Sequence, residues 1–229
     1  IGLDHHASEP DVYTLLLHRK EYSSNAELVY RTFFEGEELS KEIAEHLLLG
    51  VLGDTGNFSY ISSKQTDVLL LAKKLIEVLG VRIEEFRSRY GGIPKKIIPL
   101  IQELVKNMKY QDTNNWPDFQ YSFISRDALD KEAFTDEDIS AASHIFMRQY
   151  IKQVEGYTWG FVITPRTDGA CRMSSRSLPG SVDVNDFHQR LEVGGGHTGA
   201  AGGSFKEPDP KKCLDKVLGW MRKNKPLIT

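Results

Sequence analysis

Apolar residues recur at helical spacing through most of the first half of the chain. These stripes predict helices from Ser24 to Phe34, from Ser40 to Leu52, from Thr66 to Leu79, over 83–90 and over 94–109. Pro99 inside the last run predicts a kink or a later start. The opening run Ile1–Leu3 reads as a buried strand, whereas the apolar block within residues 11–22 fits either a strand or a turn of helix.

The pattern changes after residue 109. Residues 110–117 are polar and rich in turn formers, which predicts a linker at a domain boundary. We therefore expect an α/β protein with two domains, residues 1–109 and 118–229. In the second domain, alternating residues predict strands at 119–124, 157–163 and 170–176, with a Thr167-Asp168-Gly169 hairpin between the last two, and capping signals predict helices from Thr135 and Asp209.

The composition of the chain argues against several kinds of binding partner and structural site. The chain has 229 residues and a formal net charge of −3, which argues against binding long nucleic acid through a broad basic face. Cys171 and Cys213 lack metal-type spacing, so we expect neither a zinc finger nor a disulfide framework. With no bilayer-length apolar run and no signal-peptide pattern, we expect a cytoplasmic protein without a membrane partner. Because Ile1 lies inside an expected strand, we also expect a segment to precede it.

Candidate chemistry begins directly after the opening strand, with Asp4, His5 and His6. Strands of open α/β sheets deliver ligands at their carboxyl ends, and imidazole and carboxylate groups bind metals. The alternative is that Asp4 caps a turn and both histidines are surface residues. Asp54 lies within Gly50–Phe58, whose three glycines let a metal or phosphate approach the backbone, although a plain turn has the same composition.

A second set of candidates lies in the second domain. Arg172, Ser174 and Arg176 share one face of a predicted strand by period-two alternation. Two guanidiniums with a hydroxyl between them suit a phosphate, and an exposed polar face is the alternative. The segment Gly194–His197 predicts a loop in which a histidine follows three glycines whose amides suit an anion, although flexible turns also contain such runs. His144 has no acidic or sulfur partner at ligand spacing, so we expect it to be structural.

Asp-His-His followed by Gly-x-x-Gly-Asp-Thr-Gly-x-Phe resembles the third and fourth motifs of the DHH phosphoesterase family. This resemblance implies that His5 and Asp54 are metal ligands. It implies catalytic roles for Asp4, close to the ions, and for His6, facing the attacking water or the scissile phosphate. The implied cofactor is a pair of manganese ions, which suits phosphoester hydrolysis. The family's first two motifs belong upstream of Ile1, so the present chain is expected to lack some of the ligands.

The later motifs resemble the DHH-associated C-terminal domain, in which an Arg-x-Ser-x-Arg strand precedes a glycine-His segment and an Ala-Ala-Gly tail. Ser175 stands where that pattern usually has an apolar residue. The resemblance implies substrate binding by Arg172, Ser174, Arg176, Gly194, Gly195, Gly196 and His197.

Together these resemblances imply an architecture and an activity. The architecture is the latter part of a parallel-sheet domain joined to a smaller mixed α/β domain, with the active site in the cleft between them. The activity is manganese-dependent hydrolysis of small nucleotides: short oligoribonucleotides, 3′-phosphoadenosine 5′-phosphate, or linear or cyclic dinucleotides. The alternatives are a nucleic-acid-binding module without hydrolase activity and a catalytically incomplete fragment. The sequence leaves a homodimer open.

Overall fold

The computed structural model describes residues 2–5, 13–112, 115–129 and 133–229. It divides into two compact units, Ile1–Gly92 and Ile93–Thr229. Helices and strands occur in both units, so the expected α/β class is confirmed. None of the helices in the described ranges is long and apolar enough to cross a bilayer.

In the first unit, β1 (Gly2–Asp4) pairs in parallel with β2 (Leu16–His18). The opening run is therefore a strand that ends at Asp4, as predicted, and the block that the pattern left open is a second strand. Hydroxyls of Ser24 and Ser40 cap the first two helices by accepting hydrogen bonds from first-turn amides. The helices of this unit are α1 (Asn25–Phe33), α2 (Lys41–Asp54), α3 (Asp67–Leu79) and α4 (Ile83–Gly91).

The apolar stripes of α2 and α3 form the core of this unit, as their spacing predicts. Leu48 and Val51 on α2 and Leu75 on α3 are all 0% exposed. Full burial of an aliphatic side chain of this size stabilises the fold by roughly 1.5–3 kcal/mol. This packing holds the two helices as one body, and Asp54 is the last residue of α2.

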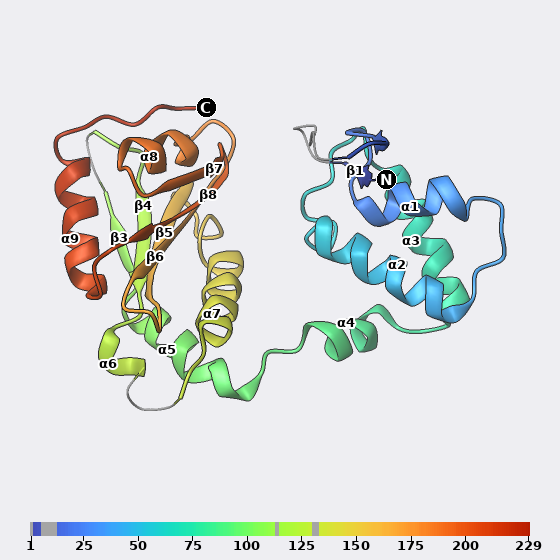
Figure 1. Ribbon diagram of the computed structural model, residues 1–229, viewed down its shortest axis with the longest axis horizontal. Helices are drawn as coiled ribbons and strands as arrows, with labels where there is room; N and C mark the ends of the chain where they lie inside the picture. Colours follow the sequence, from blue (N-terminus) through green and yellow to red (C-terminus); the bar gives the residue numbers. More distant parts are fainter. Residues whose placement is uncertain (1, 6–12, 113–114, 130–132) are drawn as a thin grey trace. The chain divides into compact units, whose positions relative to one another are not determined.

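The second unit contains a mixed sheet whose strands run in the order β3-β4-β5-β6-β8-β7 (Figure 1). Only the pair β4 and β5 is parallel among these neighbours. The strands are β3 (Lys109–Gln111), β4 (Phe119–Phe123), β5 (Trp159–Pro165), β6 (Cys171–Ser177), β7 (Gly194–His197) and β8 (Ala200–Phe205). The helices are η1 (Lys95–Ile97), α5 (Ile98–Lys106), α6 (Arg126–Leu129), α7 (Asp136–Gln149), α8 (Val184–Arg190) and α9 (Pro210–Met221).

Two hydrophobic clusters cover the two faces of this sheet. On one face, α5 and α7 pack against Val162 of β5. On the other, α8 and α9 pack against Phe161 and Trp159, whose indole lies 5.5 Å from the ring of Phe187. Cys171 and Cys213 are buried in this second cluster as free thiols. The predicted hairpin is also present, because Arg166 N donates to Ala170 O at 2.9 Å between β5 and β6.

The predicted linker at 110–117 is wrong, since the units divide between Gly92 and Ile93. The physical reason is packing. Leu100 and Leu104 of α5 are 1% and 0% exposed in the same cluster as α7, so this helix belongs to the second unit. Strand β3 pairs with β4, which draws residues 109–111 into the sheet. Pro99 stands in the first turn of α5, which confirms the later helix start.

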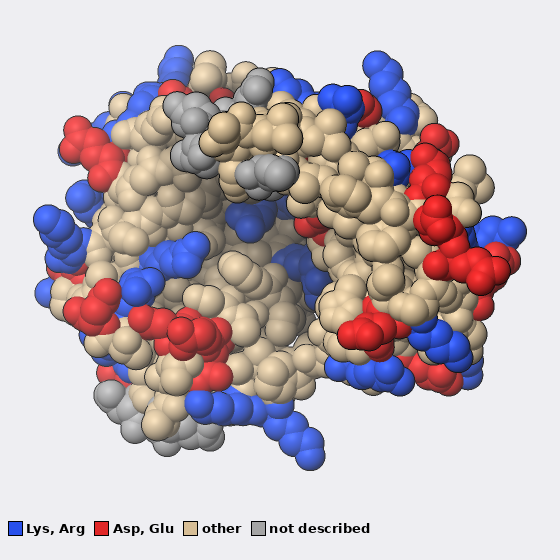
Figure 2. Space-filling model, turned by 45° about the vertical axis from the view of Figure 1, so that its right-hand side comes forward, with Lys and Arg blue, Asp and Glu red and all other residues tan. Residues whose placement is uncertain are grey.

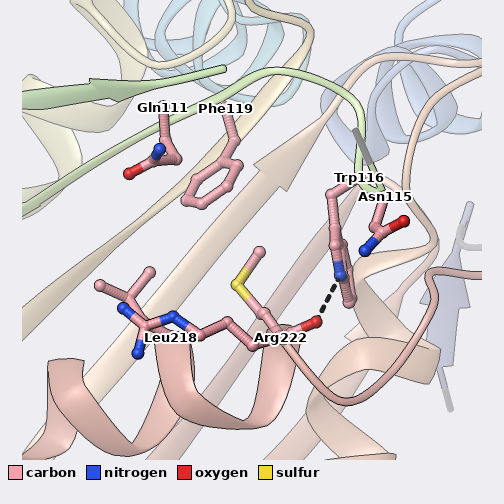
Figure 3. Close-up of a pocket in the computed structure, with 7 residues that line it drawn as sticks. Gln111, Asn115, Trp116, Phe119, Leu218 and Arg222 are labelled. Carbon is pink, nitrogen blue, oxygen red and sulfur yellow. Dashed lines mark hydrogen bonds between the residues drawn. The ribbon is translucent and has the colours of Figure 1, made fainter. Parts of the chain in front are cut away.

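A cavity of about 210 Å³ lies between α9 and the start of β4. Figure 3 shows the indole of Trp116 at its wall, where Nε1 donates a hydrogen bond to Met221 O at 2.9 Å. Phe119 belongs to the cluster under α8 and α9, so the cavity lies on that face of the sheet. Its lining is Gln111, Asn115, Trp116, Phe119, Leu218, Met221 and Arg222. None of the sequence-predicted site residues within the described ranges lines it.

Behind β6, a buried pair of polar side chains joins the sheet to α8. Ser175 Oγ lies 2.7 Å from His188 Nε2, and both residues are 0% exposed. The hydroxyl therefore has a partner, which explains how a polar residue stands where the family pattern has an apolar one. Burial lowers the pKa of His188 from 6.5 to about 4, so its ring is neutral at neutral pH.

This pair makes the stability of the second unit depend on pH. Between the two pKa values the unfolded chain binds more protons than the folded chain, so the stability present above pH 6.5 is lost as the pH falls towards 4. We expect His188→Gln to remove roughly 2–3 kcal/mol of the stability difference between about pH 7 and about pH 4.5. Urea unfolding followed by tryptophan fluorescence measures this unit, because Trp116, Trp159 and Trp220 all lie in it. An equal pH dependence in the variant and the wild type would contradict the assignment.

Candidate active site

The two predicted metal ligands, His5 and Asp54, lie close together in the first unit. His5 follows the last residue of β1, and Asp54 is the last residue of α2. His5 Nε2 lies 3.6 Å from Asp54 Oδ2, with the side chains 15% and 40% exposed. The imidazole and the carboxylate are therefore close to one another. The carboxylate of Asp54 is also exposed to solvent, so a small ligand can reach it.

A backbone amide orients the carboxylate of Asp54. Asn25 N, in the first turn of α1, donates to Asp54 Oδ2 at 3.0 Å. A helix start favours negative charge because its first amides lack partners within the helix. The carboxylate thus sits where α1 begins and α2 ends, and both helices fix its position.

Asp54 is part of a helix rather than of the glycine-rich loop that its neighbours suggested. Gly50 and Gly53 both lie within α2. Gly50 permits close contact with α1, because a Cβ there would lie 2.8 Å from the Cβ of Ala26. Gly56 follows the helix with φ +56°, a conformation that glycine adopts readily. Gly50 thus permits the packing of α2 against α1, and Gly56 permits the turn of the chain after α2. Asp54 lies between these two positions in the sequence.

Asp4 has a neighbour that the sequence did not single out. His18 Nε2 lies 4.0 Å from Asp4 Oδ2, and the side chains are 10% and 15% exposed. The pairing of β1 with β2 places these residues directly opposite one another. Only this pairing could have identified His18, because nothing in its local sequence resembles a site motif.

The residue types suit a divalent cation, but the described residues do not complete a site for one. Imidazole nitrogen and carboxylate oxygen are both ligands of transition metals such as manganese. Within the described ranges, however, no three His, Cys, Asp or Glu side chains converge on one point. His6 lies outside the described residues. The structure thus brings His5 and Asp54 together as a partial ligand set.

The second cluster is built on β6, which lies between β5 and β8. Arg172, Ser174 and Arg176 alternate with buried residues that face α8 and α9, so the three share the opposite face, as predicted. Arg172 is exposed, Arg176 is half-buried and Ser174 is 8% exposed. The strand thus presents two guanidiniums and one hydroxyl on the side of the sheet that carries α7.

The predicted glycine loop at Gly194–His197 is instead strand β7, at the edge of the sheet. A side chain at Gly196 would press on β8, since its Cβ would lie 2.5 Å from Ala200 O. The glycines therefore let two backbones approach closely rather than giving a loop its freedom. His197 pairs with Ala200, which pairs with Arg176, so His197 and Arg176 occupy one row across three strands.

Two curated relatives have the same name. The chain is 28% identical over 223 residues to the bifunctional oligoribonuclease and PAP phosphatase NrnA of Thermus thermophilus, covering 97% of this chain and 63% of that protein. It is 27% identical over 221 residues to the protein of that name from Bacillus subtilis, with 94% and 64% covered. The chain thus spans just under two thirds of the length of these relatives. No protein-family model matches it.

Among solved structures, an exopolyphosphatase-related protein from Bacteroides fragilis has the same fold. Its TM-score is 0.76 at 21% sequence identity, and the match covers 96% of this chain and 63% of that one. The chain thus has the fold of that protein. In sequence it is similar to two proteins named as oligoribonuclease and PAP phosphatase, in agreement with the resemblance that the motifs showed.

The two glycines of α2 allow a matched test of how Asp54 is positioned. Gly50→Ala should loosen α1 from α2 because of the contact with Ala26, and Ala26→Gly should rescue it. Gly53→Ala should instead stabilise the helix by roughly 0.5–1 kcal/mol, because a Cβ there meets open space. Hydrogen exchange of the α1 and α2 amides measures both effects. Equal protection in the two single variants would refute the packing role of Gly50.

Proposed function

We propose that the protein containing this chain is a phosphoesterase that hydrolyses short oligoribonucleotides and 3′-phosphoadenosine 5′-phosphate. The observation that carries the proposal is the approach of His5 Nε2 to Asp54 Oδ2 within 3.6 Å, since these residues come from two separate motifs. The names of the two curated relatives, each an oligoribonuclease and PAP phosphatase, support the same activity.

We propose manganese as the cofactor, held by His5 and Asp54 with Asp4 close by. A mixed imidazole and carboxylate set suits manganese better than magnesium, which prefers oxygen ligands. Divalent cations in such sites activate water and offset negative charge on phosphate oxygens. The chain's own contribution is to keep the carboxylate of Asp54 oriented through Asn25 N. His6 remains the proposed catalytic residue that moves a proton or orients the phosphate.

The second unit supplies cationic groups for the substrate. Guanidinium groups such as those of Arg172 and Arg176 form strong, often bidentate bonds to phosphate oxygens. On the side of the molecule drawn in Figure 2, Lys and Arg side chains are interspersed with Asp and Glu, in keeping with the net charge of −3. Local recognition by a few residues favours a small nucleotide over a long polyanion.

The first test removes the imidazole ligand. In the protein that contains this chain, His5→Ala should reduce hydrolysis of a short oligoribonucleotide and of 3′-phosphoadenosine 5′-phosphate by at least roughly a hundredfold, and it should weaken manganese binding. Activity assays and manganese titration calorimetry measure the two effects. His46→Ala is the matched control, because His46 is an exposed histidine on α2 outside the motifs. Full activity in His5→Ala would refute the proposal.

The second test concerns substrate capture. His197→Ala should raise KM by roughly tenfold while kcat changes by no more than about threefold, because its proposed role is binding rather than chemistry. Steady-state kinetics with both substrates separate the two parameters. A fall in kcat at unchanged KM would instead place His197 in the chemical step and contradict its assignment to binding.

A further inference from the structure

The cavity between α9 and the start of β4 lies apart from both motif clusters. All of the residues that line it belong to the second unit. Phe119 faces it from the side of the sheet that α8 and α9 cover, whereas Arg172 and Arg176 lie on the opposite face. The cavity is therefore separate from the proposed phosphate-binding strand, and the ligand that suits it has to be inferred from its own lining.

Two aromatic rings form fixed walls of the cavity. Trp116 is 5% exposed and Phe119 is 1% exposed. Both rings pack against Trp159, with centroid distances of 5.5 and 5.1 Å. The indole Nε1 of Trp116 also donates hydrogen bonds to Met221 O and to Asn224 O, each at 2.9 Å. These contacts hold the rings in place before a ligand arrives, which reduces the ordering cost of binding.

The same hydrogen bonds hold the backbone around Arg222. This residue follows α9 directly and stands between the two residues whose carbonyl groups accept from the indole. Among the described residues, its guanidinium makes no hydrogen bond or ion pair. Arg190 of α8, by contrast, donates to Asp186 Oδ2 at 3.1 Å and to Lys225 O at 3.0 Å. The charge of Arg222 is therefore available to a ligand in the cavity.

The polar part of the lining is positively charged. Besides Arg222 it contains the amide side chains of Gln111 and Asn115, and the described lining residues include no Asp or Glu. Figure 3 shows Gln111 and Phe119 on one side of the cavity and Leu218 and Arg222 on the opposite side. Guanidinium and amide N–H groups donate hydrogen bonds, so a negatively charged acceptor suits this set of side chains.

The volume of the cavity limits the size of the ligand. An apolar cavity of about 150 Å³ in a protein core can hold benzene. At about 210 Å³, this cavity has room for a single ring with a small substituent. Aromatic walls favour a planar ring through stacked or edge contacts. Small-molecule sites commonly combine such apolar walls with a few polar groups that orient the ligand.

We propose that this cavity binds a small molecule that consists of a single aromatic ring and a carboxylate. The ring contacts Trp116 and Phe119, and the guanidinium of Arg222 binds the carboxylate. The amides of Gln111 and Asn115 supply further donors. The inference goes beyond the proposed function, because the site lies on the other face of the sheet from the arginines of β6 and its occupation requires no hydrolysis.

The test uses the 229-residue chain and three probes. Benzoate has both the ring and the charge, benzamide has the ring without the charge, and acetate has the charge without the ring. A ligand as small as benzoate should bind with a dissociation constant of roughly 1 mM. Benzamide should bind at least about tenfold more weakly, and acetate should not saturate the site. Amide NMR measures binding through the backbone signals of Gln111 and Arg222 and the indole signal of Trp116.

Two variants separate the roles of charge and of space. Arg222→Gln should weaken benzoate binding by at least roughly tenfold and leave benzamide binding unchanged. Its matched control is Lys223→Gln, at the neighbouring exposed cation that does not line the cavity. Leu218→Phe should abolish binding of both ring probes by filling the cavity. Its control is Gly219→Ala on the same helix, where a Cβ meets open space, and this variant should bind as the wild type does.

A cation at the end of α9 also stabilises the helix through its dipole, and the two ring probes distinguish that role from binding. Loss of benzoate affinity alone in Arg222→Gln supports the proposal, since a purely structural arginine would change the affinities for both probes equally or not at all. Equal benzoate affinity in Arg222→Gln and wild type would overturn it. So would equal binding of acetate and benzoate, unchanged binding in Leu218→Phe, or the absence of a saturable shift with benzoate up to roughly twentyfold the expected constant.

Discussion

The alternation of side chains along β6 is the constraint on which the chemistry of the second unit depends. Both edges of this strand are paired, with β5 and with β8, so its backbone groups are used in the sheet. Met173 is buried in the core under α8 and α9, whereas Arg172 and Arg176 lie on the opposite face. A slip of one residue would exchange these sets and bury two guanidiniums at a large desolvation cost. The core therefore fixes the register, and the basic face follows from it.

The first unit positions its groups through helix ends. Asp54 closes α2 and accepts a hydrogen bond from the amide at the start of α1, where a helix favours negative charge. That arrangement requires the two helices to lie close together, and Gly50 permits this by facing Ala26 without a side chain. His5 enters from β1 and meets the same carboxylate. The packing of α1 against α2 thus positions Asp54, and the pairing of β1 with β2 positions His5.

Spacing and capping signals in the sequence predicted most helices and strands. The roles of several residues depend instead on neighbours that are distant in the sequence. The strand at Gly2–Asp4, the hydroxyl caps and the two-faced strand at 171–177 all follow from short-range rules of spacing and capping. The glycine run that forms β7 was misread because its role depends on the backbone of β8. His18 was missed for the same reason, since the residue that it faces, Asp4, lies on β1. The roles of the motif residues remain predictions from the resemblance.

Two histidines of the second unit have lowered pKa values, and the causes differ. His188 is buried behind the strand, and burial lowers its pKa to about 4, so it adds no positive charge beneath the arginines. His144 is exposed on α7, and its pKa is lowered first by partial desolvation and then by the charges of Arg176 and Arg172. A ligand cannot easily alter the first cause, because burial is a property of the core. At the exposed site desolvation is less complete, and the positive charges of the arginines contribute to the shift as well. The two sides of β6 therefore differ: the side under α8 holds a neutral, buried imidazole, and the side that carries α7 holds the charges of the arginines.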